Sequence, residues 1–121
     1  MNIKSLLAAL VVSLSLVTPG LAGPFEDGVA AYERKDYAAA MRILRPLAEQ
    51  GNASAQNNLG VMYAIGNGLP PDYVEAYKWA NLAAAQGNKV AEEFMDSIAA
   101  RMTSLQIAEA QRLAREWKPK K

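Results

Sequence analysis

Cysteine and histidine are both absent from this chain of 121 residues. Their absence excludes disulfides, zinc sites built on Cys or His, and mechanisms that use a cysteine nucleophile or a histidine base. Only carboxylates, Lys, Tyr, Ser and Thr remain for chemistry. The length allows one small domain, which must be held together by packing.

The carboxylates offer little for catalysis. Adjacent acidic residues occur at Glu26 with Asp27 and at Glu92 with Glu93. A glycosidase-type mechanism needs two carboxylates that face one cleft at a defined separation, whereas consecutive helix residues point about 100° apart. No phosphate-binding glycine motif follows a strand either. We therefore predict a protein that is not an enzyme, with no cofactor, no metal and no catalytic residue.

The N-terminal segment has the pattern of a secretory signal peptide. A basic start is followed by an apolar run over residues 6–17, and Gly20 and Ala22 then place small residues three and one before a cleavage point. The run is shorter than the ~20 residues that a transmembrane helix needs. We predict a signal peptide at residues 1–22, a domain at residues 23–121, and a periplasmic or secreted protein. A retained N-terminal anchor is the alternative.

Neither charge is in excess after cleavage. Removal of Lys4 leaves 12 basic and 12 acidic residues, with no basic stripe for nucleic acid and no polybasic membrane patch. The basic residues Lys118, Lys120 and Lys121 are predicted to be solvated chain. We expect a protein or peptide partner, no nucleic acid, and no membrane span after signal cleavage.

The sequence repeats itself at an offset of 36 residues. Residues 36–40 fall on residues 72–76, which share Asp-Tyr and a closing Ala, and residues 48–52 fall on residues 84–88, which share Ala and Gln-Gly-Asn. Two matches at one offset indicate an internal repeat. Repeats of this length are typical of stacked helix pairs, because each pair is too small to bury its own apolar face.

Each repeated block carries signals for the start and end of a helix. An Asp or Asn can cap the first free N–H groups of a helix, and a Gly can end a helix in the left-handed conformation. Asp72 with Glu75 also resembles a capping box. The candidate caps and stops are Asp36, Asp72, Gly51, Gly87, Asn52 and Asn88. Helices are predicted at residues 24–34, 37–50, 53–65, 73–87, 89–102 and 104–117.

One whole repeat resembles a known family. Residues 55–68 read Ala-x-x-x-Leu-Gly-x-x-Tyr-x-x-Gly-x-Gly, and residues 72–87 read Asp-x-x-x-Ala-x-x-Trp-x-x-x-Ala-Ala-x-x-Gly. This pattern is similar to the Sel-one-like repeat, a relative of the tetratricopeptide repeat. The resemblance implies an all-α fold, a short α-solenoid of antiparallel helix pairs. Its parts would be a degenerate repeat at residues 24–52, a full repeat at 53–88, a partial repeat at 89–102 and a C-terminal capping helix at 103–117.

The repeat pattern also predicts which residues pack. Gly60 would let a neighbouring helix approach closely, and Tyr63 and Trp79 would fill the space between helices. Tyr37 and Tyr73 recur at the repeat spacing, so packing explains them better than a sugar-binding platform does.

In stacks of this type the first helix of each pair lines the concave side. The repeat register therefore gives one set of candidate partner-binding residues on each of those three helices. These residues are Phe25, Val29 and Tyr32, then Asn57, Val61 and Ala64, then Glu93, Ser97 and Arg101. Their mix of apolar and polar side chains suits an extended peptide or a partner helix. The predicted function is a non-catalytic protein–protein interaction module or adaptor; the alternative is a cell-wall-associated protein that binds or modifies glycan.

Export gives the first testable prediction. We expect the mature protein to begin at Gly23, because small residues stand at the two positions that signal peptidase reads. N-terminal sequencing of protein from the cell envelope measures this directly. Envelope protein that still begins at Met1 would contradict it.

Overall fold

A computed structural model describes residues 23–121, and this part of the chain is all-helical. The predicted signal peptide lies outside the described residues. The helices begin where the sequence predicted, and their ends fall up to three residues earlier. They are α2 (Pro24–Glu33), α3 (Tyr37–Glu49), α4 (Ala53–Ile65), α5 (Tyr73–Ala85), α6 (Lys89–Ala99) and α7 (Ser104–Glu116).

The predicted caps are confirmed. The four capping side chains are those of Asp36, Asn52, Asp72 and Asn88. Each accepts a hydrogen bond from the backbone N–H three residues ahead, with N–O distances of 2.8 to 3.2 Å. Gly51 and Gly87 have φ of +105° and +92°, so both occupy the left-handed region that a β-carbon disfavours. The helix boundaries therefore follow from local sequence signals.

The capping box predicted at Asp72 is only half formed. The Asp72 carboxylate accepts from the Glu75 N–H at 3.1 Å. The return bond is missing because the Asp72 N–H donates instead to the Tyr63 carbonyl at 2.9 Å, and the Glu75 carboxylate pairs with Lys78 at 2.9 Å. A complete capping box stands at the start of α7, between Thr103 and Gln106.

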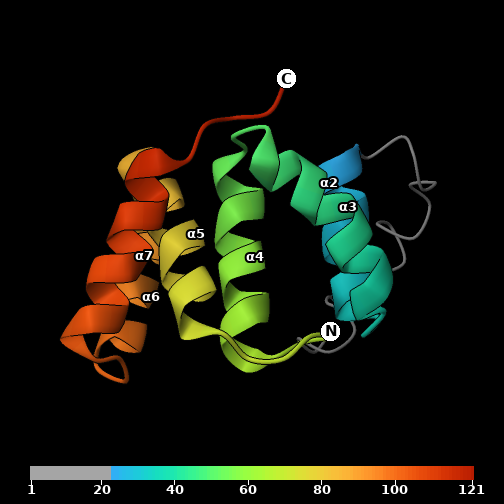
Figure 1. The fold of residues 1–121 in the computed structure, drawn as a ribbon. Helices are drawn as coiled ribbons and strands as arrows, with labels where there is room; N and C mark the ends of the chain where they lie inside the picture. The colour runs from blue at the N-terminus through green and yellow to red at the C-terminus, as the bar shows by residue number, and fades with distance from the viewer. Residues whose placement is uncertain (1–22) are drawn as a thin grey trace, which may run out of the picture.

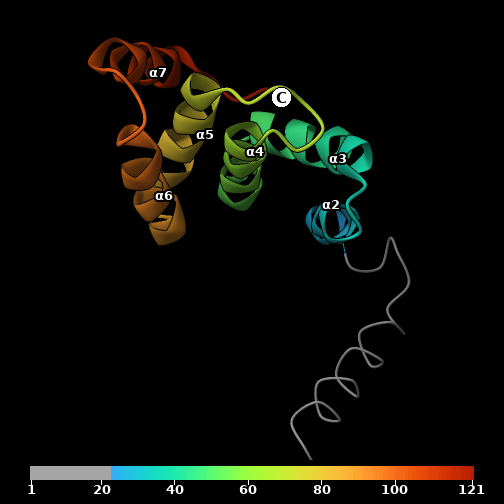
Figure 2. The same ribbon diagram turned by 90° about the horizontal axis from the view of Figure 1, so that it is seen from below.

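The helices form two layers. Seen from below, α2, α4 and α6 make one row and α3, α5 and α7 make the other (Figure 2). We call these the inner and the outer layer. In the inner layer α2 and α6 project beyond α4, so the row is curved (Figure 2). Along the stack, consecutive helices from α2 to α6 pack on one another, whereas α7 packs on α5 (Figure 1).

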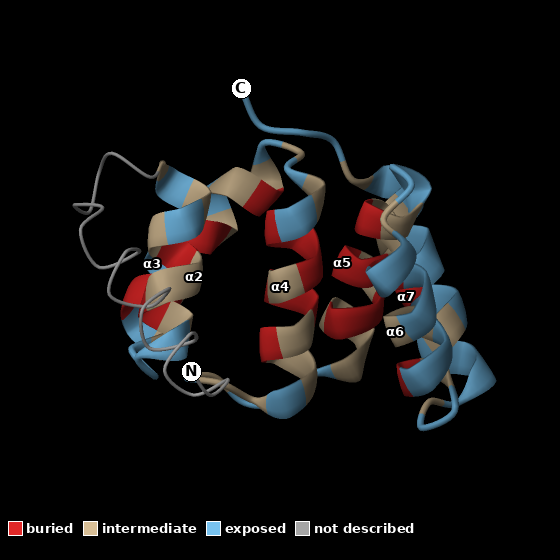
Figure 3. Cartoon of the chain, turned by 180° about the vertical axis from the view of Figure 1, so that it is seen from behind, coloured by how far each residue is buried: buried red, intermediate tan, exposed pale blue. Residues whose placement is uncertain are grey.

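The helices α4 and α5 approach each other closely at Gly60. A β-carbon built at Gly60 would lie 3.0 Å from the Ala76 carbonyl oxygen and 3.4 Å from the Ala80 nitrogen. Ala76, Ala80 and Ala83 on α5 are fully buried, and the buried faces of both helices lie in the centre of the stack (Figure 3). The predicted close approach at Gly60 is confirmed.

Residues 66–71 connect α4 to α5, and they also contact the first repeat. Gly68 has φ of +76°, and a β-carbon there would lie 2.8 Å from the β-carbon of Tyr37. Between the two glycines, Asn67 accepts a hydrogen bond from the Tyr32 hydroxyl at 3.0 Å. The Gly-x-Gly sequence therefore lets this loop lie against the first repeat.

The helix α7 and the residues after it close the stack. Ala110 is buried and Ile107, Leu113, Ala114 and Trp117 are half-buried, while Gln106, Glu109, Arg112 and Glu116 are exposed, so α7 has one apolar face and one polar face, as a capping helix needs. The rings of Trp79 and Trp117 meet edge to face, with centroids 6.3 Å apart.

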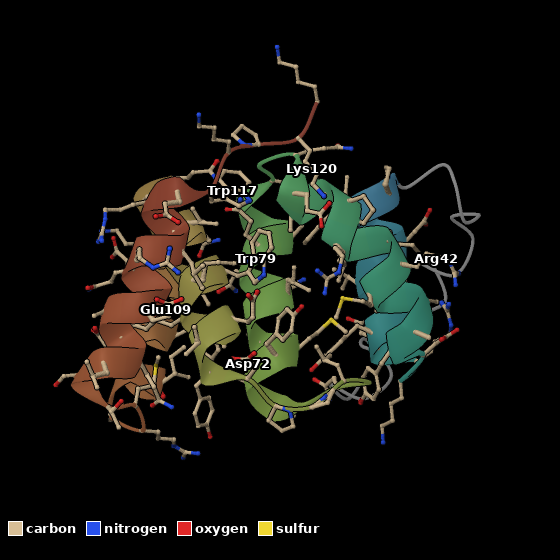
Figure 4. The ribbon with its side chains drawn as sticks, in the orientation of Figure 1. Arg42, Asp72, Trp79, Glu109, Trp117 and Lys120 are labelled. Carbon is tan, nitrogen blue, oxygen red and sulfur yellow. The ribbon has the colours of Figure 1, made fainter. Side chains whose placement is uncertain are left out.

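The chain after Trp117 crosses over the end of α4 toward α3 (Figure 4). Lys120 donates its N–H to the Glu49 carbonyl at 2.7 Å, and its Nζ lies 3.0 Å from the Glu49 carboxylate. The segment is exposed, as expected, but Lys120 ties it to the first repeat.

The fold predicts the effect of Gly60→Leu. The new side chain meets backbone atoms of α5, and overpacking of this kind costs ~1–3 kcal/mol. The gain in helix propensity, at most ~1 kcal/mol, offsets part of this. We expect a lower melting temperature, at ~4–8 °C per kcal/mol for a domain of this size.

Ala108→Leu is the matched control, because it enlarges an exposed position on α7. Circular dichroism melts of both variants measure the difference. Equal melting temperatures would show that α4 and α5 do not depend on the small residue.

Candidate interaction site

A pocket of about 250 Å³ opens between α2 and α4. Its walls are mostly apolar, and one carboxylate and one amide side chain contribute polar groups. The lining residues are Val29, Tyr32 and Glu33 from α2, and Asn58 and Val61 from α4. Both helices belong to the inner layer, so the pocket lies on the curved side of the stack.

The way in which α2 packs explains its contribution to the pocket. Gly28 and Ala31 are buried, and a β-carbon at Gly28 would lie 2.6 Å from the Leu44 side chain. This close approach directs the Gly28 face of α2 at α3. Val29, Tyr32 and Glu33 are left on the side that faces the pocket.

The contribution of α4 is a narrow open stripe. This helix packs against α3, α5 and α6, and most of its circumference is buried. Ser54 and Ile65 are exposed, and Asn58 and Val61 are half-buried. These four residues are spaced four, three and four apart, which is the spacing of one helix face. We call them the open stripe of α4.

Tyr32 is held in place before any partner binds. Its hydroxyl donates to Asn67 at 3.0 Å, and its ring packs on Tyr37 with centroids 5.5 Å apart. The loop of residues 66–71 thus fixes one wall of the pocket, which lowers the entropic cost of ordering that wall on binding.

The predicted partner-binding residues fall into different environments. Val29, Tyr32 and Val61 line the pocket, while Phe25 packs against the buried cluster that runs from α2 to α5. Glu93 and Ser97 on α6, and Arg101 in the turn after it, are exposed but lie outside the pocket.

The expected outward orientation is wrong for Asn57 and Ala64. Asn57 is 9% exposed, and Ala64 is half-buried against the buried cluster that α5, α6 and α7 form. The expected face of α4 was rotated, because α4 has three neighbouring helices and its open face lies on the side of Asn58. The residues missed were Glu33 and Asn58. The signal for Asn58 was the four-three-four spacing of the open stripe, and the signal for Glu33 was its place four residues after Val29 on the same helix face.

The ionisable groups of α6 and α7 lie on exposed helix faces. Glu92 and Glu93 are both exposed on α6, as predicted for a solvated face. On α7, Arg112 bonds to Glu109 and Glu116 (Glu109 is labelled in Figure 4). The hydrogen bond from Arg112 holds the pKa of Glu109 below its ordinary value, and the network lies on the exposed side of the helix. Among residues 23–121 no cluster of acidic residues could hold a metal ion.

Stacked antiparallel helix pairs with left-handed glycines between them define an α-solenoid of helical repeats. The sequence model of the Sel1 repeat matches this chain at residues 22–52 and again at residues 53–88. The chain belongs to the Sel1 repeat family, and the resemblance seen in the sequence is confirmed. Sel1 repeats generally mediate protein–protein interaction. A comparison with curated proteins gave no match. No helix in residues 23–121 is long and apolar enough to cross a membrane.

The burial of Asn57 predicts a contrast between two neighbouring residues. The Asn57 Oδ1 has no hydrogen-bond partner among the described residues, so Asn57→Asp would bury a charge without a partner. We expect this change to destabilise the fold by about 2 kcal/mol or more. Asn58→Asp, on the open stripe, should change stability by no more than ~0.5 kcal/mol.

Urea unfolding of the two variants, which carry the same chemical change, measures the difference. Equal stabilities would mean that Asn57 reaches water and that the face of α4 is misassigned.

Proposed function

We propose that this protein is a non-catalytic adaptor of the cell envelope, or a secreted one, that binds a segment of another protein in the pocket between α2 and α4. The observation that carries the proposal is the pocket itself, with Val29, Tyr32 and Val61 as an apolar floor and Glu33 and Asn58 as polar groups. Interaction pockets commonly combine an apolar centre with a polar rim.

The size of the pocket supports a side chain as its occupant. Pockets that enclose drug-sized ligands have volumes of ~300–1,000 Å³, and this pocket is smaller, at about 250 Å³. One large apolar side chain of a bound peptide fits such a space better than a cofactor does. The rest of the peptide would run along the inner layer.

The proposed location rests on the sequence of residues 1–22, which has the charge, apolar length and small residues of a signal peptide. An adaptor in the envelope would meet its partner after export.

A capture experiment tests the proposal. The purified protein is immobilised and incubated with an envelope extract, and sedimentation with purified peptidoglycan is measured in parallel. We expect a protein partner to be retained, and Val61→Asp to reduce its retention about tenfold or more, since a few central residues dominate most interfaces. Ala108→Asp places the same charge on an exposed outer-layer helix and should bind like the unchanged protein.

Circular dichroism first checks that both variants fold. Sedimentation with peptidoglycan in the absence of any retained protein would favour the glycan-binding alternative. Equal retention by Val61→Asp would place the interface elsewhere.

A further inference from the structure

The charges of this neutral domain are segregated between its two layers. The inner layer, α2, α4 and α6, carries six acidic residues and one basic residue, whereas the outer layer, α3, α5 and α7, carries four acidic and five basic residues. The acidic residues of the inner layer are Glu26, Asp27, Glu33, Glu92, Glu93 and Asp96. The inner layer therefore has a net charge of −5.

The two layers also differ in how many of their acidic residues form ion pairs. Every acidic residue of the outer layer has a cation within 4.0 Å. In the inner layer Glu92 alone is paired, with Lys89 at 3.9 Å; among residues 23–121 the other five acidic residues have no such cation. The acidic residues of the outer layer are thus neutralised within the fold, and most of those in the inner layer are not.

One of the unpaired carboxylates belongs to the pocket. Glu33 contributes to its wall beside Val29 and Val61, and Glu26, two helical turns earlier, lies on the same side of α2. The nearest cations along the chain, Arg34 and Lys35, stand in the turn that leads to the outer layer. The pocket thus combines apolar walls with an uncompensated negative charge.

We propose that the occupant of this pocket is a cationic peptide segment, in which an apolar side chain enters between Val29 and Val61 and a neighbouring Lys or Arg pairs with Glu33. This inference rests on the proposed function and names the chemistry of the partner. A negative layer attracts such a segment at long range and repels acidic ones. The apolar side chain supplies most of the affinity, because an exposed ion pair contributes little.

Three short fluorescein-labelled peptides test the inference by anisotropy. The first has a Leu between Lys residues, the second replaces Lys with Glu, and the third replaces Leu with Ser. We expect the first to bind most tightly, and its affinity to fall as salt is raised from about 0.1 M to about 1 M, because the screening length shrinks from ~10 Å to ~3 Å.

A matched pair of variants separates the pocket from the overall charge. Glu33→Gln should weaken binding of the first peptide about two- to fivefold, the range of an exposed ion pair. Gln111→Lys makes the same change in net charge on the exposed face of α7, and it should leave the affinity unchanged.

The inference is overturned if none of the peptides binds, if the acidic peptide binds as tightly as the basic one, or if Glu33→Gln binds like the unchanged protein. The capture experiment distinguishes these outcomes from failure of the adaptor proposal. A partner whose retention depends on Val61 but not on salt or Glu33 would leave the proposed function standing and would remove only the cationic chemistry.

Discussion

The close approach of α4 and α5 at Gly60 is the constraint on which the stack depends. A β-carbon there would meet the backbone of α5 at 3.0 Å, so the two helices can touch because Gly60 has no side chain and Ala76, Ala80 and Ala83 have short ones. Contact at this distance allows α5 to support α4 on one side and α6 and α7 on the other. The second repeat is thereby the centre to which the first repeat and the two C-terminal helices attach.

The same contact determines which residues face outward. The helix α4 packs against α5 at Gly60 and also against α3 and α6. Its surface that faces away from all three is the open stripe of Ser54, Asn58, Val61 and Ile65. The surface proposed for interaction is therefore what remains after packing, and it is narrow. Tyr32, fixed by Asn67 at 3.0 Å, provides the opposite wall, so the loop between repeats contributes to the site as well as to the fold.

Local signals explain why so much of the fold could be predicted. A cap such as Asp36 or Asn52 acts over three residues, and a left-handed Gly51 acts at its own position, so both can be recognised in sequence. The orientation of α4 depends on three other helices, and there the prediction placed Asn57 outward when it is buried. The ion pair between Lys120 and Glu49 joins residues far apart in sequence, and no local sequence pattern predicts it.

Acidic residues outnumber basic ones in the inner layer but not in the outer layer, so the two layers differ in charge although residues 23–121 are neutral as a whole. A net charge of zero suggests a surface without electrostatic preference, yet the acidic residues of the outer layer are all paired within the fold, and most of those in the inner layer are not. Exposed pairs add little stability, so leaving the inner charges unpaired costs the fold little. It preserves a field on the side where α2 and α4 form the pocket. An overall neutral solenoid can therefore discriminate between partners by the sign of their charge.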